Sequence, residues 1–391
     1  MAEFYYISEC LDSIKKQTYN NFEVYICVNQ PEEFWENPEK KNICENNLRT
    51  IELLKKETEI PINILDKSSK GEGWQGKYFG VGAARKFLMD EIVNVASNND
   101  IIISLDADTT FGEKYFQSVL DIFIENPNAV GLSNPYYHKL TDDTNANRAI
   151  LHYEIYMRYY AINLLRIESP YAFSALGSAI AFPVSVYNTL GGLTAKKSGE
   201  DFYFLQKLRK FGKLVTWNSE KVYPASRFSD RVFFGTGPAM IKGNEGDWES
   251  YPIYNYRLFD KISQTYKAFP KLYKEDFDVP LSKFISNCFK DENIWKSLRI
   301  NARDEEHFIK ACQDKIDGLR ILQFLKNEQK AEINSDEFVL KEFLETFHSN
   351  VLNKEISEIL NELNFKVTSI QNLDIIRNLL VEIEEHSQKN N

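Results

Sequence analysis

The stretch IIISLDAD, residues 101–108, decides which fold the chain is expected to have. The run IIISL is typical of a strand that is buried on both faces of a parallel sheet. Asp106 and Asp108 follow it directly, and residues two apart on an extended chain point to the same side. In open α/β sheets, ligands bind just outside the carboxyl ends of the strands. The stretch therefore predicts an α/β sheet with a ligand site at this edge.

A hard divalent cation suits this pair of carboxylates. Mg²⁺ or Mn²⁺ accepts one or two carboxylates and completes its shell with water and substrate phosphates. Asp106 and Asp108 could therefore hold a diphosphate through a metal ion. A D-x-D pattern also occurs by chance in an acidic chain, as a solvated loop after a strand. The position directly after a strand is what favours a metal site.

Strand-like and helix-like segments alternate through the first 240 residues or so. The predicted strands are 22–29, 62–65, 101–105 and 129–133, and the predicted helices are 38–56, 77–96 and 115–124. This alternation predicts a mostly parallel sheet flanked by helices. After about residue 246, segments rich in Lys, Glu and Leu show helical spacing and strand-like runs mostly disappear. We expect an α/β domain at 1–240 and a mainly helical region at 241–391, with the boundary in the glycine-bearing stretch 235–247.

The composition excludes several classes of protein. The chain has 391 residues, of which 43% are hydrophobic, and a formal net charge of −10, so it lacks the basic footprint of a nucleic-acid-binding protein. Its five cysteines are odd in number and form no C-x-x-C, which predicts reduced thiols in a cytoplasmic protein. No apolar run approaches the roughly 20 residues that span a bilayer. A peripheral contact with the inner face of a membrane remains open.

Three further segments carry groups that could take part in chemistry. Glu200 and Asp201 either favour a helix start or supply a general base near an acceptor hydroxyl. Arg85, in the segment GVGAARK at 80–86, could pair with a phosphate or a base, or lie on an ordinary solvated helix. Arg227 and Arg231 precede a glycine-bearing segment that could close over a diphosphate or serve as an interdomain linker.

These segments occur in an order that resembles family 2 glycosyltransferases, which have the GT-A fold, a Rossmann-like α/β architecture. The opening CLDSIKKQTYNNFEVYICVN at 10–29 resembles the family's S-x-x-x-Q-T-Y-x-x-F-E stretch. GVGAARK resembles its G-x-x-x-A-R-N segment, and LDAD at 105–108 resembles its metal-binding D-x-D. GEDFYFLQKLRKFG at 199–212 resembles its E-D segment. The resemblance covers about residues 4–240, and four segments in the right order are fairly specific.

The resemblance implies an inverting, hexosyltransferase-like enzyme of the kind used in polysaccharide biosynthesis. A Mn²⁺ or Mg²⁺ ion at Asp106 and Asp108 would neutralise the departing nucleoside diphosphate. Asp201 would deprotonate the acceptor hydroxyl, and Glu200 would orient the acceptor or Asp201.

The resemblance also implies which residues bind the two substrates. Those expected to bind the donor, a UDP- or GDP-sugar, are Asn29, Arg85, Asp106, Arg227 and Arg231. Gly177 and Ser178 fall in a segment like the family's acceptor-site strand, where a glycan, a lipid-linked molecule or a small molecule would bind.

The chain departs from the family at two places. The family's first strand normally precedes the Q-T-Y helix, and here only AEFYYISE lies between Met1 and that helix. We therefore expect the domain to be N-terminally truncated relative to the family. The family often has acidic residues after the next strand, where they meet the base, whereas this chain has Asn29, Gln30 and Pro31. The identity of the nucleotide stays open.

Two other functions remain as alternatives at this point. A sugar-phosphate nucleotidyltransferase uses a related sheet, but its Gly-rich signature would lie in a region that this chain lacks. A catalytically degenerate scaffold that binds sugars or nucleotides is favoured by the absent strand. The helical C-terminal region could bind the acceptor, form a homodimer or cover the sheet.

Overall fold

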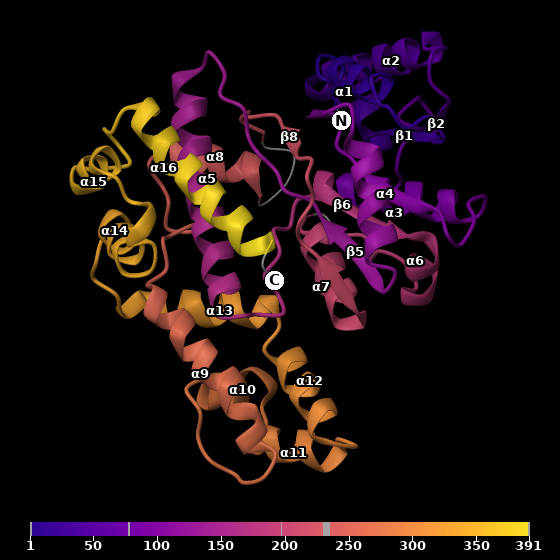
Figure 1. The fold of residues 1–391 in the computed structure, drawn as a ribbon. Helices are drawn as coiled ribbons and strands as arrows, with labels where there is room; N and C mark the ends of the chain where they lie inside the picture. The colour runs from indigo at the N-terminus through magenta and orange to yellow at the C-terminus, as the bar shows by residue number, and fades with distance from the viewer. Residues whose placement is uncertain (1, 77–78, 197, 230–234, 390–391) are drawn as a thin grey trace. The chain divides into compact units, whose positions relative to one another are not determined.

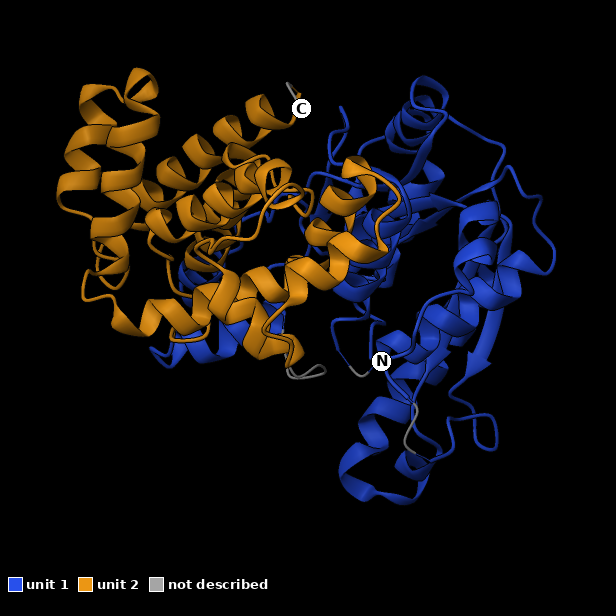
Figure 2. Cartoon of the chain, turned by 90° about the horizontal axis from the view of Figure 1, so that it is seen from below, with its two compact units in different colours: residues 1–150, 173–247 blue, residues 151–172, 248–391 orange. Residues whose placement is uncertain are grey.

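The computed structural model describes residues 2–76, 79–196, 198–229 and 235–389 (Figure 1). The chain divides into two compact units, which Figure 2 colours separately. Unit 1 comprises residues 1–150 and 173–247, and unit 2 comprises residues 151–172 and 248–391. Helix α5 (Thr144–Arg166) begins in unit 1 and continues in unit 2. Residues 151–172 therefore belong with the C-terminal helices. The division predicted from the sequence, 1–240 and 241–391, places these residues in the α/β domain.

Unit 1 contains the strands of the described chain. They are β1 (Val24–Asn29), β2 (Ile62–Lys67), β3 (Ile101–Ser104), β4 (Thr109–Phe111), β5 (Ala129–Ser133), β6 (Ile180–Pro183), β7 (Lys213–Val215) and β8 (Val222–Pro224). β1 and β2 form a parallel pair, and β4 and β8 an antiparallel pair. The four-stranded sheet has the order β3-β6-β5-β7. This sheet is mixed, because β6 runs antiparallel to both of its neighbours while β5 and β7 are parallel.

Helices and short turns connect these strands. The helices are α1 (Ile7–Lys15), α2 (Lys41–Lys56), α3 (Val81–Val93), α4 (Tyr115–Glu125), α6 (Val184–Leu190), α7 (Glu200–Phe211) and α8 (Thr236–Asn244). The 3-10 turns are η1 (Glu32–Glu36), η2 (Pro38–Lys40) and η3 (Gly177–Ala179). The α/β class predicted from the sequence is confirmed. The stretch 235–247, predicted to hold the boundary, contains α8, whose Ala239 and Met240 are fully buried, and the last division between the two units follows Asp247.

Unit 2 is built from helices throughout its described residues. Besides the later part of α5 they are α9 (Tyr256–Leu272), α10 (Ser282–Phe289), α11 (Ile294–Asn301), α12 (Glu305–Lys315), α13 (Gly318–Glu328), α14 (Asp336–Phe347), α15 (Lys354–Asn361) and α16 (Ile370–Lys389), with the turns η4 (Gln329–Ala331) and η5 (Ser349–Val351). Five of these helices start at a side chain that caps the first turn. The caps of α9, α12, α13, α14 and α15 are Asn255, Asp304, Asp317, Ser335 and Asn353. The predicted helical region is confirmed.

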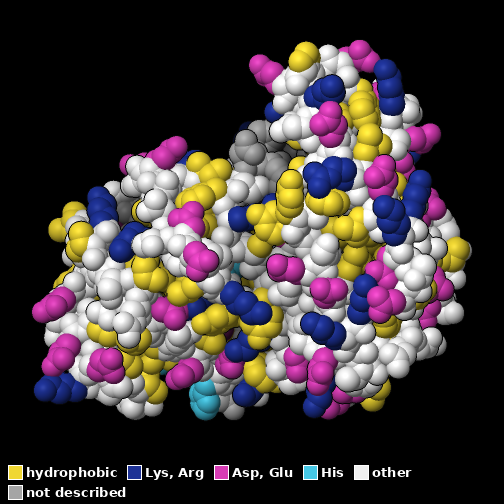
Figure 3. Space-filling view, turned by 90° about the horizontal axis from the view of Figure 1, so that it is seen from above, with side chains coloured by type: hydrophobic (Ala, Val, Ile, Leu, Met, Phe, Trp, Pro, Cys, Tyr) yellow, Lys and Arg dark blue, Asp and Glu magenta, His cyan; other side chains and the backbone are white. Residues whose placement is uncertain are grey.

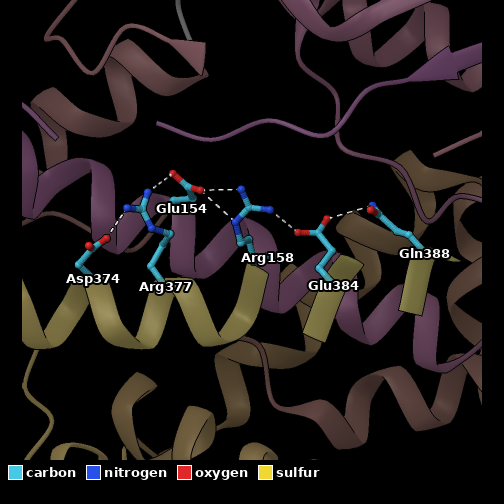
Figure 4. Close-up of polar contacts among 6 residues, drawn as sticks. All are labelled: Glu154, Arg158, Asp374, Arg377, Glu384 and Gln388. Atoms are coloured by element: carbon cyan, nitrogen blue, oxygen red, sulfur yellow. Dashed lines mark hydrogen bonds and ion pairs between the residues drawn. The ribbon is translucent and has the colours of Figure 1, made fainter. Parts of the chain in front are cut away.

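A buried chain of ion pairs joins α5 to α16 within unit 2 (Figure 4). Arg158 donates to Glu154 at 2.6 Å and to Glu384 at 2.5 Å. Arg377 donates to the other oxygen of Glu154 at 3.1 Å and also pairs with Asp374. The Arg377 and Glu154 side chains are fully buried. Burial raises the pKa of Glu384, and Arg158 opposes that rise. The network fixes the register of these two helices, because slipping either one would leave buried charges unpaired.

The surface carries both signs of charge. Figure 3 shows Lys and Arg side chains interspersed with Asp and Glu side chains over the face seen from above. In the part of the chain that the structure describes, no helix combines the length and the apolar character that crossing a bilayer requires.

Replacing Arg377 by Met is expected to lower the free energy of unfolding by about 3–5 kcal/mol, because Glu154 stays buried with one partner fewer. Urea unfolding followed by circular dichroism measures this change. Lys354→Met is the control, since Lys354 is 92% exposed in its pair with Glu358 and should cost about 0.5 kcal/mol or less. A cost for Arg377→Met no larger than that of the control would contradict the proposed role of the network.

Candidate active site

β3 and β6 bring two distant segments of the chain to one edge of the four-stranded sheet. β3 ends at Ser104, whose partner across the ladder is Ile180, the first residue of β6. Because this pair is antiparallel, the turn η3 that precedes β6 lies beside the residues that follow β3. The Ser104 hydroxyl donates to the carbonyl oxygen of Gly177 at 2.8 Å. The ladder thus brings Asp106 and η3 to the same edge.

Arg85 on α3 joins the carboxylate of Asp106 to that of Glu200. One terminal nitrogen of its guanidinium donates to Asp106 and the other donates to Glu200. The Arg85 side chain is 9% exposed and that of Glu200 is 2% exposed. Removing one partner of a buried ion pair costs several kcal/mol, because it leaves an uncompensated charge. Arg85 therefore holds α3, the end of β3 and the start of α7 at one point.

Gly177 provides the space that the Arg85 guanidinium occupies. A Cβ atom on Gly177 would lie 2.1–2.2 Å from the guanidinium atoms, far inside van der Waals contact. Only glycine therefore fits here while Arg85 keeps both of its carboxylates. The neighbouring Ser178 is 2% exposed. Binding of the acceptor by Gly177 and Ser178 stays a prediction.

Two carboxylates open α7. Gly199 caps the helix in the left-handed region, with φ of 71°, and Glu200 and Asp201 follow in the first turn. The backbone N–H of Phe202 donates to the Asp201 carboxylate at 2.7 Å. Burial, and then the charge of Glu200, raise the pKa of Asp201 to about 6, while Arg85 acts in the opposite direction. A carboxylate with a pKa near the working pH is suited to general base catalysis.

A second arginine binds the other member of the D-x-D pair. The Arg227 guanidinium donates to Asp108 Oδ2 from Nε at 2.9 Å and from a terminal nitrogen at 2.5 Å. The same terminal nitrogen donates to Glu3 at 2.6 Å, and the Tyr6 ring lies 4.0 Å from the guanidinium carbon. Burial, and then the charge of Asp106, raise the pKa of Asp108, and Arg227 opposes the rise. Asp106 and Asp108 are thus each paired with a different arginine.

The two aspartates also fit a hard cation. They offer only oxygen donors, and their charges lie close enough for Asp106 to disfavour ionisation of Asp108. A dication between them would relieve that repulsion, and the Asp106 side chain is 39% exposed. Among the described residues, no cluster of three or more His, Cys, Asp or Glu side chains is placed to hold a metal. A cation here would therefore complete its shell with water and substrate oxygens.

Asn29 lies at the carboxyl end of β1, far along the chain from the ion pairs of Arg85 and Arg227. Its side-chain oxygen accepts a hydrogen bond from the Trp74 indole at 3.3 Å, and the Lys67 ammonium lies over the Trp74 ring. An amide beside an aromatic ring can recognise a planar base, but donor binding by Asn29 stays a prediction. Arg231, also predicted to bind the donor, lies outside the described residues.

Three residues that contact the predicted site residues were not predicted from the sequence. Glu3 and Tyr6 contact Arg227, and Trp74 contacts Asn29. Trp74 lies in a glycine-bearing loop after a predicted strand, and that position could have drawn attention to it. Glu3 and Tyr6 carry no comparable signal, because the Arg227 that they contact is more than 200 positions away in the chain.

Comparisons with known proteins add little to this site. No family model matches the chain. No curated protein matches it either. Among solved structures, S. aureus TarS 1–349 in complex with UDP-GlcNAc matches at 11% identity, over 98% of this chain and 89% of that one, with a TM-score of 0.40. The same protein in complex with UDP matches at 10% identity, over 97% and 88%, with a TM-score of 0.38. Likeness at this level carries no weight for function, which must be judged from the residues of the site.

Replacing Gly177 by Ala is expected to lower the free energy of unfolding by about 1–3 kcal/mol, because the new methyl group displaces the Arg85 guanidinium. The same replacement should cost clearly less in an Arg85→Lys background, whose side chain ends in a smaller group. A double-mutant cycle from urea unfolding measures the difference. Equal costs in the two backgrounds would show that Gly177 does not serve to make room for Arg85.

Proposed function

We propose that this chain is a glycosyltransferase that moves a sugar from a nucleoside diphosphate sugar to an acceptor hydroxyl, with inversion at the anomeric carbon. One observation supports this most directly. A single guanidinium, that of Arg85, holds the D-x-D residue Asp106 together with Glu200, the neighbour of Asp201. A transferase needs a donor-side charge and an acceptor-side base at one place, because it must align two substrates for in-line attack.

We assign Asp201 the role of general base. Its carboxylate takes the proton of the acceptor hydroxyl as the hydroxyl oxygen attacks the anomeric carbon. The bond from that carbon to the diphosphate oxygen breaks, and the electron pair leaves with the nucleoside diphosphate. Attack from the face opposite the leaving group inverts the configuration. Glu200 is buried and bound to Arg85, so its part is to hold Arg85 and the first turn of α7 in position.

We assign Asp106 and Asp108 to the binding site of the donor. They would hold a Mn²⁺ or Mg²⁺ ion, which supplies Lewis-acid stabilisation of the departing diphosphate. Arg227 contacts Asp108 and places a further positive charge beside the same position. A negatively charged leaving group is stabilised by cationic groups that are already in place before the reaction.

Incubation with UDP- and GDP-sugars and Mn²⁺ tests the proposal against its alternatives. Metal-dependent release of UDP or GDP supports a glycosyltransferase. Consumption of a sugar phosphate and a nucleoside triphosphate, with release of pyrophosphate, would identify a nucleotidyltransferase instead. Binding of a nucleotide sugar without any turnover would favour a degenerate binding protein.

Asp201→Asn is expected to lower kcat by about 100-fold or more while donor binding is retained, because the change removes only the base. Steady-state kinetics measure kcat, and calorimetric titration measures the affinity for the donor. Asp121→Asn is the control, since Asp121 is an exposed aspartate on α4 and should leave both quantities unchanged. Full activity of Asp201→Asn would rule out this role for Asp201.

The pH profile of the wild type gives a second readout of the same assignment. A base works only when it is deprotonated, so kcat/KM, which reports the free enzyme, should rise with pH, with a midpoint near the Asp201 pKa of about 6, and level off above it. A rate that is flat from about pH 5 to pH 7.5 would contradict the assignment.

A further inference from the structure

Strand pairing sets Arg227 beside Asp108. Thr109, the first residue of β4, pairs with Pro224, the last residue of β8, in an antiparallel ladder. The chain that enters β4 therefore runs alongside the chain that leaves β8. Asp108 directly precedes β4, and Arg227 follows β8 by three positions. Their contact is thus a product of the fold and does not depend on a ligand.

The pair is partly shielded from water, and two further side chains contact the guanidinium. The side chains of Arg227, Asp108 and Glu3 are 19%, 15% and 13% exposed. Both donor hydrogens of the contact go to the same carboxylate oxygen, Asp108 Oδ2. Glu3 binds the guanidinium on another side, and the Tyr6 ring lies against its carbon at 4.0 Å. A cation over an aromatic ring is stabilised further when it is partly desolvated.

The two arginines of the site differ in how readily they could leave their carboxylates. Arg85 lies within α3, is 9% exposed and is bound on two sides by Asp106 and Glu200. Arg227 lies in irregular chain after β8 and is more exposed. Of these two arginines, Arg227 is therefore the one that a cation approaching the aspartates displaces more readily.

We propose that Arg227 is the internal counter-ion of Asp108, which a divalent cation must displace, and that Glu3 and Tyr6 are positioning residues that hold it in place. This inference rests on the proposed function, because it takes Asp108 as a ligand of the cation. The displaced guanidinium stays beside the position of the nucleoside diphosphate and can bind its phosphate oxygens. The cation and Arg227 thus exchange partners, so that Asp108 always has a positive neighbour.

Titration of the full chain with Mn²⁺ alone, followed by the electron paramagnetic resonance signal of the free ion, tests this exchange without nucleotide or turnover. Arg227→Gln should raise the affinity for Mn²⁺ by about tenfold or more, because the competing charge is gone. Arg303→Gln is the matched control, since Arg303 is 76% exposed in unit 2 and its loss should leave Mn²⁺ affinity unchanged. An Arg227→Gln variant that is no better than the control would overturn the proposal.

Tyr6→Leu is the second variant, because it keeps every charge and removes only the ring beneath the guanidinium. It should raise Mn²⁺ affinity by about two- to fivefold, the size expected from losing one cation–π contact. It also keeps the proposal testable if Arg227→Gln does not fold, in which case an unchanged affinity for Tyr6→Leu overturns it. Failure of the wild type and both variants to bind Mn²⁺ below about 1 mM would overturn it as well.

Parallel titrations with UDP and with GDP in the presence of Mn²⁺ separate this inference from the proposed function. If Arg227→Gln binds Mn²⁺ more tightly and no form binds UDP or GDP, the counter-ion role stands and the transferase proposal fails. If the wild type binds UDP with Mn²⁺ and Arg227→Gln leaves Mn²⁺ affinity unchanged, the transferase stands and the counter-ion role fails.

Discussion

The arrangement of the site depends on one interaction, the bond of the Arg85 guanidinium to both Asp106 and Glu200. These carboxylates come from segments almost 100 residues apart, one after β3 and the other at the start of α7. A buried guanidinium needs both of them, and it also needs a neighbour without a side chain, which Gly177 provides. Four distant parts of the chain are thereby fixed around a single charge.

The carboxylates differ because their surroundings differ. Glu200 is buried and bound to Arg85, whereas Asp201, one residue later, has its pKa raised to about 6 by burial and by the charge of Glu200. Asp106 is the more exposed member of its pair, whereas Asp108 is covered by Arg227. Asp106, Asp108 and Glu200 are each paired with an arginine, whereas the Asp201 carboxylate accepts from the backbone N–H of Phe202. Unequal environments of this kind are how a site separates positioning from chemistry.

Local patterns predicted the parts of the fold that depend on local physics. The predicted strand at 129–133 has the bounds of β5, and the predicted helix at 115–124 ends one residue before α4 does. Apolar spacing and capping side chains act within a few residues, so they can be read from the chain. The sequence also singled out Arg85, Asp106, Glu200 and Asp201 but could not show that one guanidinium joins them. The contact of Glu3 with Arg227, and the inclusion of residues 151–172 in unit 2, depend on long-range packing that no local pattern encodes.

The central claim is that Asp106 is the donor-side carboxylate of a nucleotide-sugar site. Calorimetric titration of UDP and of GDP in the presence of Mn²⁺, into the wild type and into Asp106→Asn, tests it most directly. We expect one of the two nucleotides to bind the wild type at one site per chain, and Asp106→Asn to weaken this binding by about tenfold or more while the variant remains folded. Absence of binding to the wild type, or equal binding to the variant, would contradict it.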